Sequence, residues 1–328
     1  MRPERGSFAE ANIKKSTLGC HAGGSLRVLL GMSQSVTEGT AAADPQPRHR
    51  IRVLDTEMSY VDVGRGHPIV FLHGNPTYSY LWRNIIPHLS GLGRCLAPDL
   101  VGMGHSGRSP TYSYRFVDHV RYLNAWFEAL GLTKNLTLVV HDWGCFIARS
   151  ATPARSGRSP ICIVQPMRWD DFGKAGGIFR MFRSVEGERL ILDQNAFVER
   201  VLPRAILRTL KEDEMAAYRA PYGDREARLP TLIWPRQIPI EGEPADVTAI
   251  VERYGKWLSK SRIPKLFIAG DPGAILTESA SGRAFCQTWA NQRELTVKGR
   301  HFLQEDSPDQ IGEALRDVVT ALEPRAST

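Results

Sequence analysis

The stretch Leu136-Thr137-Leu138-Val139-Val140-His141-Asp142-Trp143-Gly144 decides how the rest of the chain is interpreted. A run of Leu, Thr and Val that ends in polar residues and a glycine is typical of a buried parallel strand followed by a sharp turn. Such a turn exposes one side chain above the sheet edge, here Asp142. A carboxylate there suits displacement at a saturated carbon, because water can hydrolyse the resulting ester. Alternatively, Asp142 only caps the following helix, a common role for Asp.

The composition is that of an ordinary globular protein. Of 328 residues, 42% are hydrophobic and 23% are charged, which suffices for one large domain with an insertion or for two domains. The five Cys are scattered without metal-ligand spacing, which favours reduced thiols and a cytoplasmic location. The longest apolar run near the start, residues 26–30, is too short for a signal peptide or membrane span. We expect no cofactor, no metal and no membrane partner, and a monomer.

The net charge of +7 does not predict a nucleic-acid partner. Residues 1–50 carry seven Lys or Arg against four acidic residues, and residues 145–162 carry three Arg and no acid. A nucleic-acid site needs basic residues along one folded face rather than in a tail and one irregular segment.

The order of predicted elements indicates an α/β fold with a mostly parallel, doubly wound sheet. Residues 1–48 show no periodicity and predict a flexible extension. The core is expected at residues 49–165 and 239–325, and a helical cap at 166–238. The segments expected as strands are 51–54, 58–63, 68–72, 94–98, 136–140, 161–164, 265–269 and 294–297. The main segments expected as helices are 80–89, 114–130, 178–182, 195–201, 212–218, 245–258 and a closing helix after Ser307, which is expected to cap it with Gln310.

Two residues complete a catalytic pattern with Asp142. Asp271 follows the strand at 265–269, and His301 follows the last strand. Nucleophile, acid and histidine occur in this order along α/β-hydrolase chains. The sequence therefore predicts that Asp142, Asp271 and His301 meet at the carboxyl edge of the sheet.

Several motifs resemble those of the haloalkane dehalogenases. The resemblance runs from about Ile51 to Val319 and rests on these stretches: His73-Gly74-Asn75-Pro76-Thr77, Leu81-Trp82-Arg83-Asn84-Ile85, His141-Asp142-Trp143-Gly144, Phe197-Val198-Glu199-Arg200-Val201-Leu202-Pro203, Pro264-Lys265-Leu266-Phe267-Ile268 and His301-Phe302-Leu303-Gln304-Glu305-Asp306-Ser307-Pro308. It implies an α/β-hydrolase that releases halide and an alcohol from a haloalkane and water.

The resemblance also implies roles for single residues. Asp142 would form an alkyl ester, and His301 would activate the water that hydrolyses it. Asn75 and Trp143 would bind the halide through side-chain N–H groups and form the oxyanion hole through backbone N–H groups. Epoxide hydrolases share the His-Asp-Trp-Gly motif, but usually carry an aromatic residue in place of Asn75 and use cap tyrosines. Tyr218 and Tyr222 of this chain are expected to serve in packing.

The segment at about 145–162 departs from the family. Pro153 should stop a helix after two turns, because an interior proline costs roughly 3 kcal/mol. Ile161 stands where related dehalogenases carry the Glu that orients the histidine. An altered reading frame would explain the disruption, and the coding DNA tests this. The chain is therefore expected to be weakly active or inactive, and an inactive α/β-hydrolase scaffold is the alternative function. Asp271 could replace the missing Glu, or could only cap the turn at Pro272-Gly273.

Overall fold

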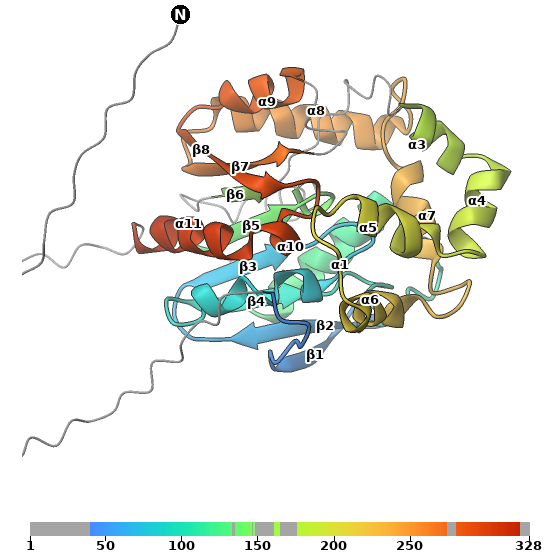
Figure 1. Ribbon diagram of the computed structural model, residues 1–328, viewed down its shortest axis with the longest axis horizontal. Helices are drawn as coiled ribbons and strands as arrows, with labels where there is room; N and C mark the ends of the chain where they lie inside the picture. The colour runs from blue at the N-terminus through green and yellow to red at the C-terminus, as the bar shows by residue number, and fades with distance from the viewer. Residues whose placement is uncertain are drawn as a thin grey trace, which may run out of the picture. The chain divides into compact units, whose positions relative to one another are not determined.

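The predicted strands join in one mixed β-sheet in the computed structural model (Figure 1). The structure describes residues 40–132, 135–145, 147, 161–164, 176–273 and 280–321. Within these ranges the sheet has eight strands in the order β1-β2-β4-β3-β5-β6-β7-β8. The pairs β1–β2 and β2–β4 are antiparallel, and the other neighbours are parallel. The predicted fold class, a mostly parallel α/β sheet, is confirmed.

The strand bounds agree closely with the expected segments, although several strands begin earlier or end later. The strands are β1 (Arg48–Val53), β2 (Thr56–Val63), β3 (Pro68–Leu72), β4 (Arg94–Pro98), β5 (Thr137–His141), β6 (Ile161–Val164), β7 (Lys265–Pro272) and β8 (Gln292–Gly299). Every residue of the central strand β5 is buried, whereas the edge strand β8 mixes buried and exposed residues. This difference follows from position, because a central strand of such a sheet is covered on both faces.

Helices cover the sheet on both sides of its strands. Helix α1 (Phe116–Ala129) contacts β1, and α11 (Pro308–Thr320) contacts β8 and the 3₁₀ turn η2 (Ile86–His88). The other helical elements of the core are η1 (Ser79–Trp82), α8 (Ala245–Lys260), α9 (Ala280–Gln287) and the short α10 (Leu303–Asp306). The core is one large apolar cluster that includes Trp82, Trp126 and Phe267, each at most 1% exposed.

A set of cap helices lies between β6 and α8 in the chain and beside the sheet in Figure 1. They are α3 (Gly176–Phe182), α4 (Val185–Leu192), η4 (Phe197–Val201), α5 (Leu202–Arg204), α6 (Glu212–Arg219), η5 (Ala220–Tyr222) and α7 (Leu229–Arg236). Part of the cap has a small apolar core of its own, made of Phe182, Ile191, Leu192, Phe197 and Leu232. The predicted cap boundaries, 166 and 238, stay a prediction, since residues 166–175 lie outside the described residues.

The predicted extension ends earlier than residue 48. The backbone of Ala41 accepts a hydrogen bond from Arg83 Nε at 2.7 Å and donates one to Asn84 Oδ1 at 3.1 Å. The carbonyl of Ala42 accepts a bond from the Tyr80 hydroxyl. A flexible tail up to residue 48 is therefore wrong for this part, because its backbone is bonded to the core. Residues 1–39 lie outside the described residues.

Two local expectations are also wrong. The segment 80–89 forms two 3₁₀ turns instead of one α-helix; its bonds span three residues, as from Arg83 N to Tyr80 O, and Pro87 lacks the N–H that a longer helix needs. Ser307 does not cap α11 with its side chain, because its hydroxyl donates to the carbonyl of Lys298 at 2.7 Å.

The described residues contain neither a membrane-spanning helix nor a cluster of metal ligands. No helix among them combines the length and the apolar character that crossing a bilayer requires. No group of three or more His, Cys, Asp or Glu side chains in the same residues is arranged to hold a metal ion. The expectation that the protein needs no cofactor stays a prediction.

Candidate active site

Asp142 lies on a tight turn directly after β5. Its φ of +51° is in the left-handed region, which a non-glycine residue enters only at some cost in backbone energy. The turn passes close to β3, because a Cβ atom on Gly144 would lie 2.5 Å from the carbonyl oxygen of Leu72. The sequence His-Asp-Trp-Gly thus provides the small residue that this close approach needs. The predicted strand and turn match this geometry, but the predicted exposure of the carboxylate is wrong, because Asp142 is buried at 6% exposed.

The two carboxylate oxygens of Asp142 have different partners. The backbone N–H of Asn75 donates to Oδ1 at 2.9 Å, and His301 Nε2 lies 3.4 Å from Oδ2. Burial alone would raise the pKa of Asp142, but the hydrogen bond and the charge of His301 outweigh it, so the pKa lies below its ordinary value. Asp142 is therefore ionised at neutral pH, as a nucleophilic carboxylate must be.

The loop after β3 is built around that carboxylate. A Cβ atom on Gly74 would overlap Asp142 Oδ1, so only glycine fits beside this carboxylate. Burial holds the pKa of His73 below its ordinary value, and the ring is neutral. Its Nε2 accepts the N–H of Leu100 at 2.9 Å, so Nδ1 carries the proton and donates to the Gly74 carbonyl at 3.0 Å. His73 thus fixes the loop that holds Asp142.

His301 is held by backbone contacts from two directions. Its N–H donates to the carbonyl of Ala205 in the cap at 2.9 Å, and its own carbonyl accepts a bond from His141 Nε2, also at 2.9 Å. Burial lowers the pKa of His141 to about 3, so the ring is neutral with its proton on Nε2. The side chain of His301 is 13% exposed, and its ring centroid is 4.7 Å from that of His141.

The two predicted halide ligands, Asn75 and Trp143, both contact α7 of the cap. Asn75 Nδ2 donates to the carbonyl of Thr231 at 3.4 Å, which leaves its second N–H without a partner among the described residues. The Trp143 ring lies 4.6 Å from the ring of Trp234 and is 2% exposed. Both side chains therefore lie where the carboxyl edge of the sheet meets the cap.

Asp271 is not brought to the other candidates in the way that the sequence predicted. Strand β7 continues to Pro272, so Asp271 lies within the strand, paired with Lys298, rather than after it. Its side chain is exposed, and among the described residues His301 forms an ion pair with Asp142 but none with Asp271. Ile161, where the family's Glu was expected, lies in β6, and its side chain is outside the described set.

Both cap tyrosines are buried, and the packing role expected for them stays a prediction. Tyr218 is 0% exposed and its hydroxyl donates to Glu305 Oε1. Tyr222 is 1% exposed.

Several residues that support the site were missed from the sequence. No separate role was predicted for His141 and His73, which belong to recognised motifs. Ala205 and Thr231 act through backbone carbonyls, which no side-chain pattern predicts. The position of the two histidines in the sequence could have indicated their role. Each lies at the end of a buried strand, where the polar atoms of an uncharged ring need hydrogen-bond partners. His73 has partners for both nitrogens, whereas His141 has one for Nε2 and none for Nδ1 among the described residues.

Comparisons with known proteins agree with this geometry. A family model described as the alpha/beta hydrolase fold matches residues 67–308. A haloalkane dehalogenase of Sphingobium indicum is 51% identical over 286 residues, which cover 84% of this chain and 95% of that protein. One of Mycolicibacterium smegmatis is 46% identical over 288 residues, which cover 84% of this chain and 92% of that protein.

Solved structures are similar over the same part of the chain. The haloalkane dehalogenase DbeA from Bradyrhizobium elkani superposes with a TM-score of 0.78 at 43% identity, covering 84% of this chain and 98% of that one. The haloalkane dehalogenase DatA from Agrobacterium tumefaciens superposes with a TM-score of 0.77 at 33% identity, covering 85% and 98%.

Proposed function

The chain belongs to the haloalkane dehalogenases of the α/β-hydrolase fold, and on this premise we propose that Asp142 and His301 hydrolyse a carbon–halogen bond in two steps. The substrates are a haloalkane and water, and the products are an alcohol, a halide ion and a proton. The observation that carries the proposal is the different environment of the two Asp142 oxygens, one held by the Asn75 N–H and the other facing His301.

In the first step Asp142 Oδ2 attacks the carbon that bears the halogen. A C–O bond forms, the carbon–halogen bond breaks, and its electron pair leaves with the halide ion. The second side-chain N–H of Asn75 and the indole N–H of Trp143 donate hydrogen bonds to the departing halide. Support for these roles comes from the position of both residues beside α7 of the cap.

In the second step water attacks the carbonyl carbon of the ester. His301 Nε2 takes a proton from the water, and negative charge develops on Asp142 Oδ1, where the Asn75 N–H stabilises it. The intermediate then expels the alkoxide, which takes a proton to give the alcohol, and the remaining proton leaves for solvent. The water oxygen stays in Asp142, and the alcohol keeps an oxygen of the original carboxylate.

The residue that orients the imidazolium of His301 is the open part of the proposal. Asp271 remains a candidate, because it lies at the carboxyl end of β7, next to the strand that leads to His301. Its exposure and its lack of an ion pair with His301 among the described residues favour the other role, a structural one at the strand end. Substitution of Asp271 separates the two roles.

The proposal extends to a monomeric, cytoplasmic enzyme. Cys95 and Cys145 are buried thiols outside any disulfide, which agrees with a reducing compartment. Size-exclusion chromatography with light scattering tests the monomer, and a mass of twice 36.6 kDa would contradict it.

Halide release from a terminal bromoalkane tests the function. The experiment uses purified protein in water enriched in ¹⁸O and is limited to a single turnover. We expect bromide in solution, ¹⁸O in the Asp142 peptide and ordinary oxygen in the alcohol. Label in the alcohol would mean that water attacks the substrate directly, and turnover of an epoxide without bromide release would assign the chain to a different reaction.

A further inference from the structure

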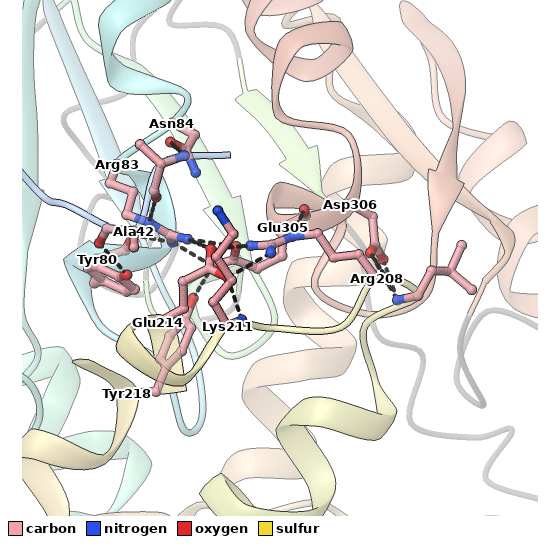
Figure 2. A network of polar contacts seen from close by, with 12 residues as sticks. Ala42, Tyr80, Arg83, Asn84, Arg208, Lys211, Glu214, Tyr218, Glu305 and Asp306 are labelled. Carbon is pink, nitrogen blue, oxygen red and sulfur yellow. Dashed lines mark hydrogen bonds and ion pairs between the residues drawn. The ribbon is translucent and has the colours of Figure 1, made fainter. Parts of the chain in front are cut away.

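A buried charge cluster joins the cap to the segment that carries His301. We define it as Arg83 and Glu305 from the core and Arg208 and Glu214 from the cap. Figure 2 shows their side chains converging with Tyr218 beside them. Arg83, Glu214 and Glu305 have side chains that are 0% exposed, and that of Arg208 is 22% exposed.

Arg83 uses all five of its N–H donors. Two bonds reach the two carboxylate oxygens of Glu305, at 2.6 and 2.9 Å, and one reaches Glu214 Oε1 at 2.9 Å. The other two go to the carbonyls of Ala41 and Tyr80. A buried guanidinium with every donor satisfied holds its partners in one arrangement, because a shift of any partner leaves a buried N–H without an acceptor.

Arg208 repeats the pattern from the cap side. It donates to both oxygens of Glu214, at 2.6 and 2.8 Å, and to Glu305 Oε2 at 2.5 Å. Burial would raise the pKa of Glu214, but hydrogen bonds from Arg208 and the Lys211 backbone outweigh it and lower the pKa to about 2. Two guanidinium groups therefore face two carboxyl groups, and that of Glu214 is ionised at neutral pH.

The cluster is continuous with the backbone contacts of His301. Arg208 Nε donates to the carbonyl of Glu305 at 2.7 Å. The carboxylate of Asp306 accepts the N–H groups of Leu207 and Arg208 in the cap and of Arg300 beside the histidine. Together with the bond from His301 N–H to Ala205, these contacts fasten the segment Arg204–Arg208 to Arg300–Asp306.

We infer that the charge cluster and Asp306 form a positioning device for His301, which serves the second step of the proposed hydrolysis more than the first. The inference rests on the proposed function. Asp142 has separate support from Asn75 and Gly74 after β3, which have no bond to residues 204–208 among the described contacts. Loss of the cluster should therefore move His301 and leave the nucleophile in place.

The test uses two variants and one matched control. Arg208→Gln removes the partly exposed guanidinium, and Asp306→Asn replaces one acceptor oxygen by a donor without unbalancing Arg83. Arg108→Gln is the control, because Arg108 also links core to cap, through Asp224 and Glu226, but it makes no contact with residues 300–306 among the described ones. Rapid-quench kinetics measures the halide burst and the steady state separately.

In both variants we expect a burst of one halide per active site within about threefold of the unchanged rate. Steady-state turnover should fall tenfold or more, because a misplacement of about 1 Å can cost roughly 10²-fold, and alkylated Asp142 should accumulate in the mass spectrum. Arg108→Gln should keep both rates. An equal loss in both phases, an unchanged steady state, or a control that behaves like Arg208→Gln would overturn the inference.

A second measurement does not depend on turnover. In protein labelled with ¹⁵N-histidine, the His301 ring signals should shift in Arg208→Gln and Asp306→Asn and stay unchanged in Arg108→Gln. If the unmodified protein releases no halide, the proposed function fails while this spectrum still tests the positioning. Ring signals of His301 that are identical in all four proteins would contradict it.

Discussion

His141 Nε2 lies 2.9 Å from the carbonyl oxygen of His301, so the residue just before the proposed nucleophile holds the backbone of the proposed general base. The contact links the ends of β5 and β8, which are not neighbours in the sheet. Because the pKa of His141 is lowered to about 3, its ring stays neutral and keeps the Nε2 proton throughout the neutral range. Titration of His141 should thus leave the relative placement of Asp142 and His301 unchanged above about pH 4.

Asp142→Asn is expected to reduce halide release by at least about 10⁴-fold, because the amide is a far poorer nucleophile than the carboxylate. The fold should persist, since Asn tolerates the left-handed φ of this position better than most residues. Bromide release and circular dichroism measure the two effects. A variant that keeps more than a small fraction of the rate would rule out Asp142 as nucleophile.

His301→Gln is expected to stop turnover after the first step. Asp142 would still attack the haloalkane, but the ester would lack the base that activates water. Mass spectrometry of the Asp142 peptide after incubation with a bromoalkane should show the added alkyl group. A burst of halide without any adduct would contradict the assignment of the two steps.

Asn75→Ala should slow the halide burst by about 10² to 10³-fold, the usual loss for one donor of a preorganised pair. The backbone N–H of residue 75 remains, so the bond to Asp142 Oδ1 is kept and the effect isolates the side chain. Single-turnover kinetics provides the rate. A change below threefold would mean that the halide is bound elsewhere.

Gly74→Ala is expected to displace Asp142 and abolish turnover, because the new methyl group would overlap the carboxylate. Gly91→Ala is the matched control: its Cβ would meet no atom within 4 Å, and its φ is not in the left-handed region. Halide release and melting temperature are compared for the pair. Full activity of Gly74→Ala would show that the loop and the nucleophile are not packed as described.

Asp271→Asn is expected to change turnover less than threefold, because the side chain is exposed and not paired with His301 among the described residues. If Asp271 is the acid, the loss should approach 10⁴-fold, as for the corresponding Asp of serine proteases.

The same assay on a chain whose residues 145–162 are replaced by a dehalogenase-like helix and Met-Glu-Ala strand end tests the predicted impairment. Equal rates for the two chains would mean that the segment is no defect.

The strand and turn around Asp142 could be predicted from the sequence because the forces there are local. The apolar run before Asp142 requires a buried strand, and Gly144 permits the close turn that follows. The bounds of strands at the sheet centre could be predicted equally well. The predicted and observed ends of β3 and β4 coincide.

Contacts between distant segments could not be predicted in the same way. The bond from His301 N–H to the carbonyl of Ala205 depends on how the cap docks, and any residue type could supply that carbonyl. The closing helix was placed correctly, but the Ser307 hydroxyl bonds to the carbonyl of Lys298 in β8 instead of capping the helix, because a tertiary partner competed with the local one. Helix α4 was missed since its short, charged sequence lacks a long apolar stripe.

The charge cluster can be completed only late in the synthesis of the chain. Glu305 follows Arg208 by 97 residues and Arg83 by 222, so on the ribosome both arginines emerge long before their shared carboxylate does. Until then Glu214 is the one carboxylate of the cluster that the two arginines can pair with. A chain released before this segment is made would therefore lack the ion pairs that join Glu305 to Arg83 and Arg208.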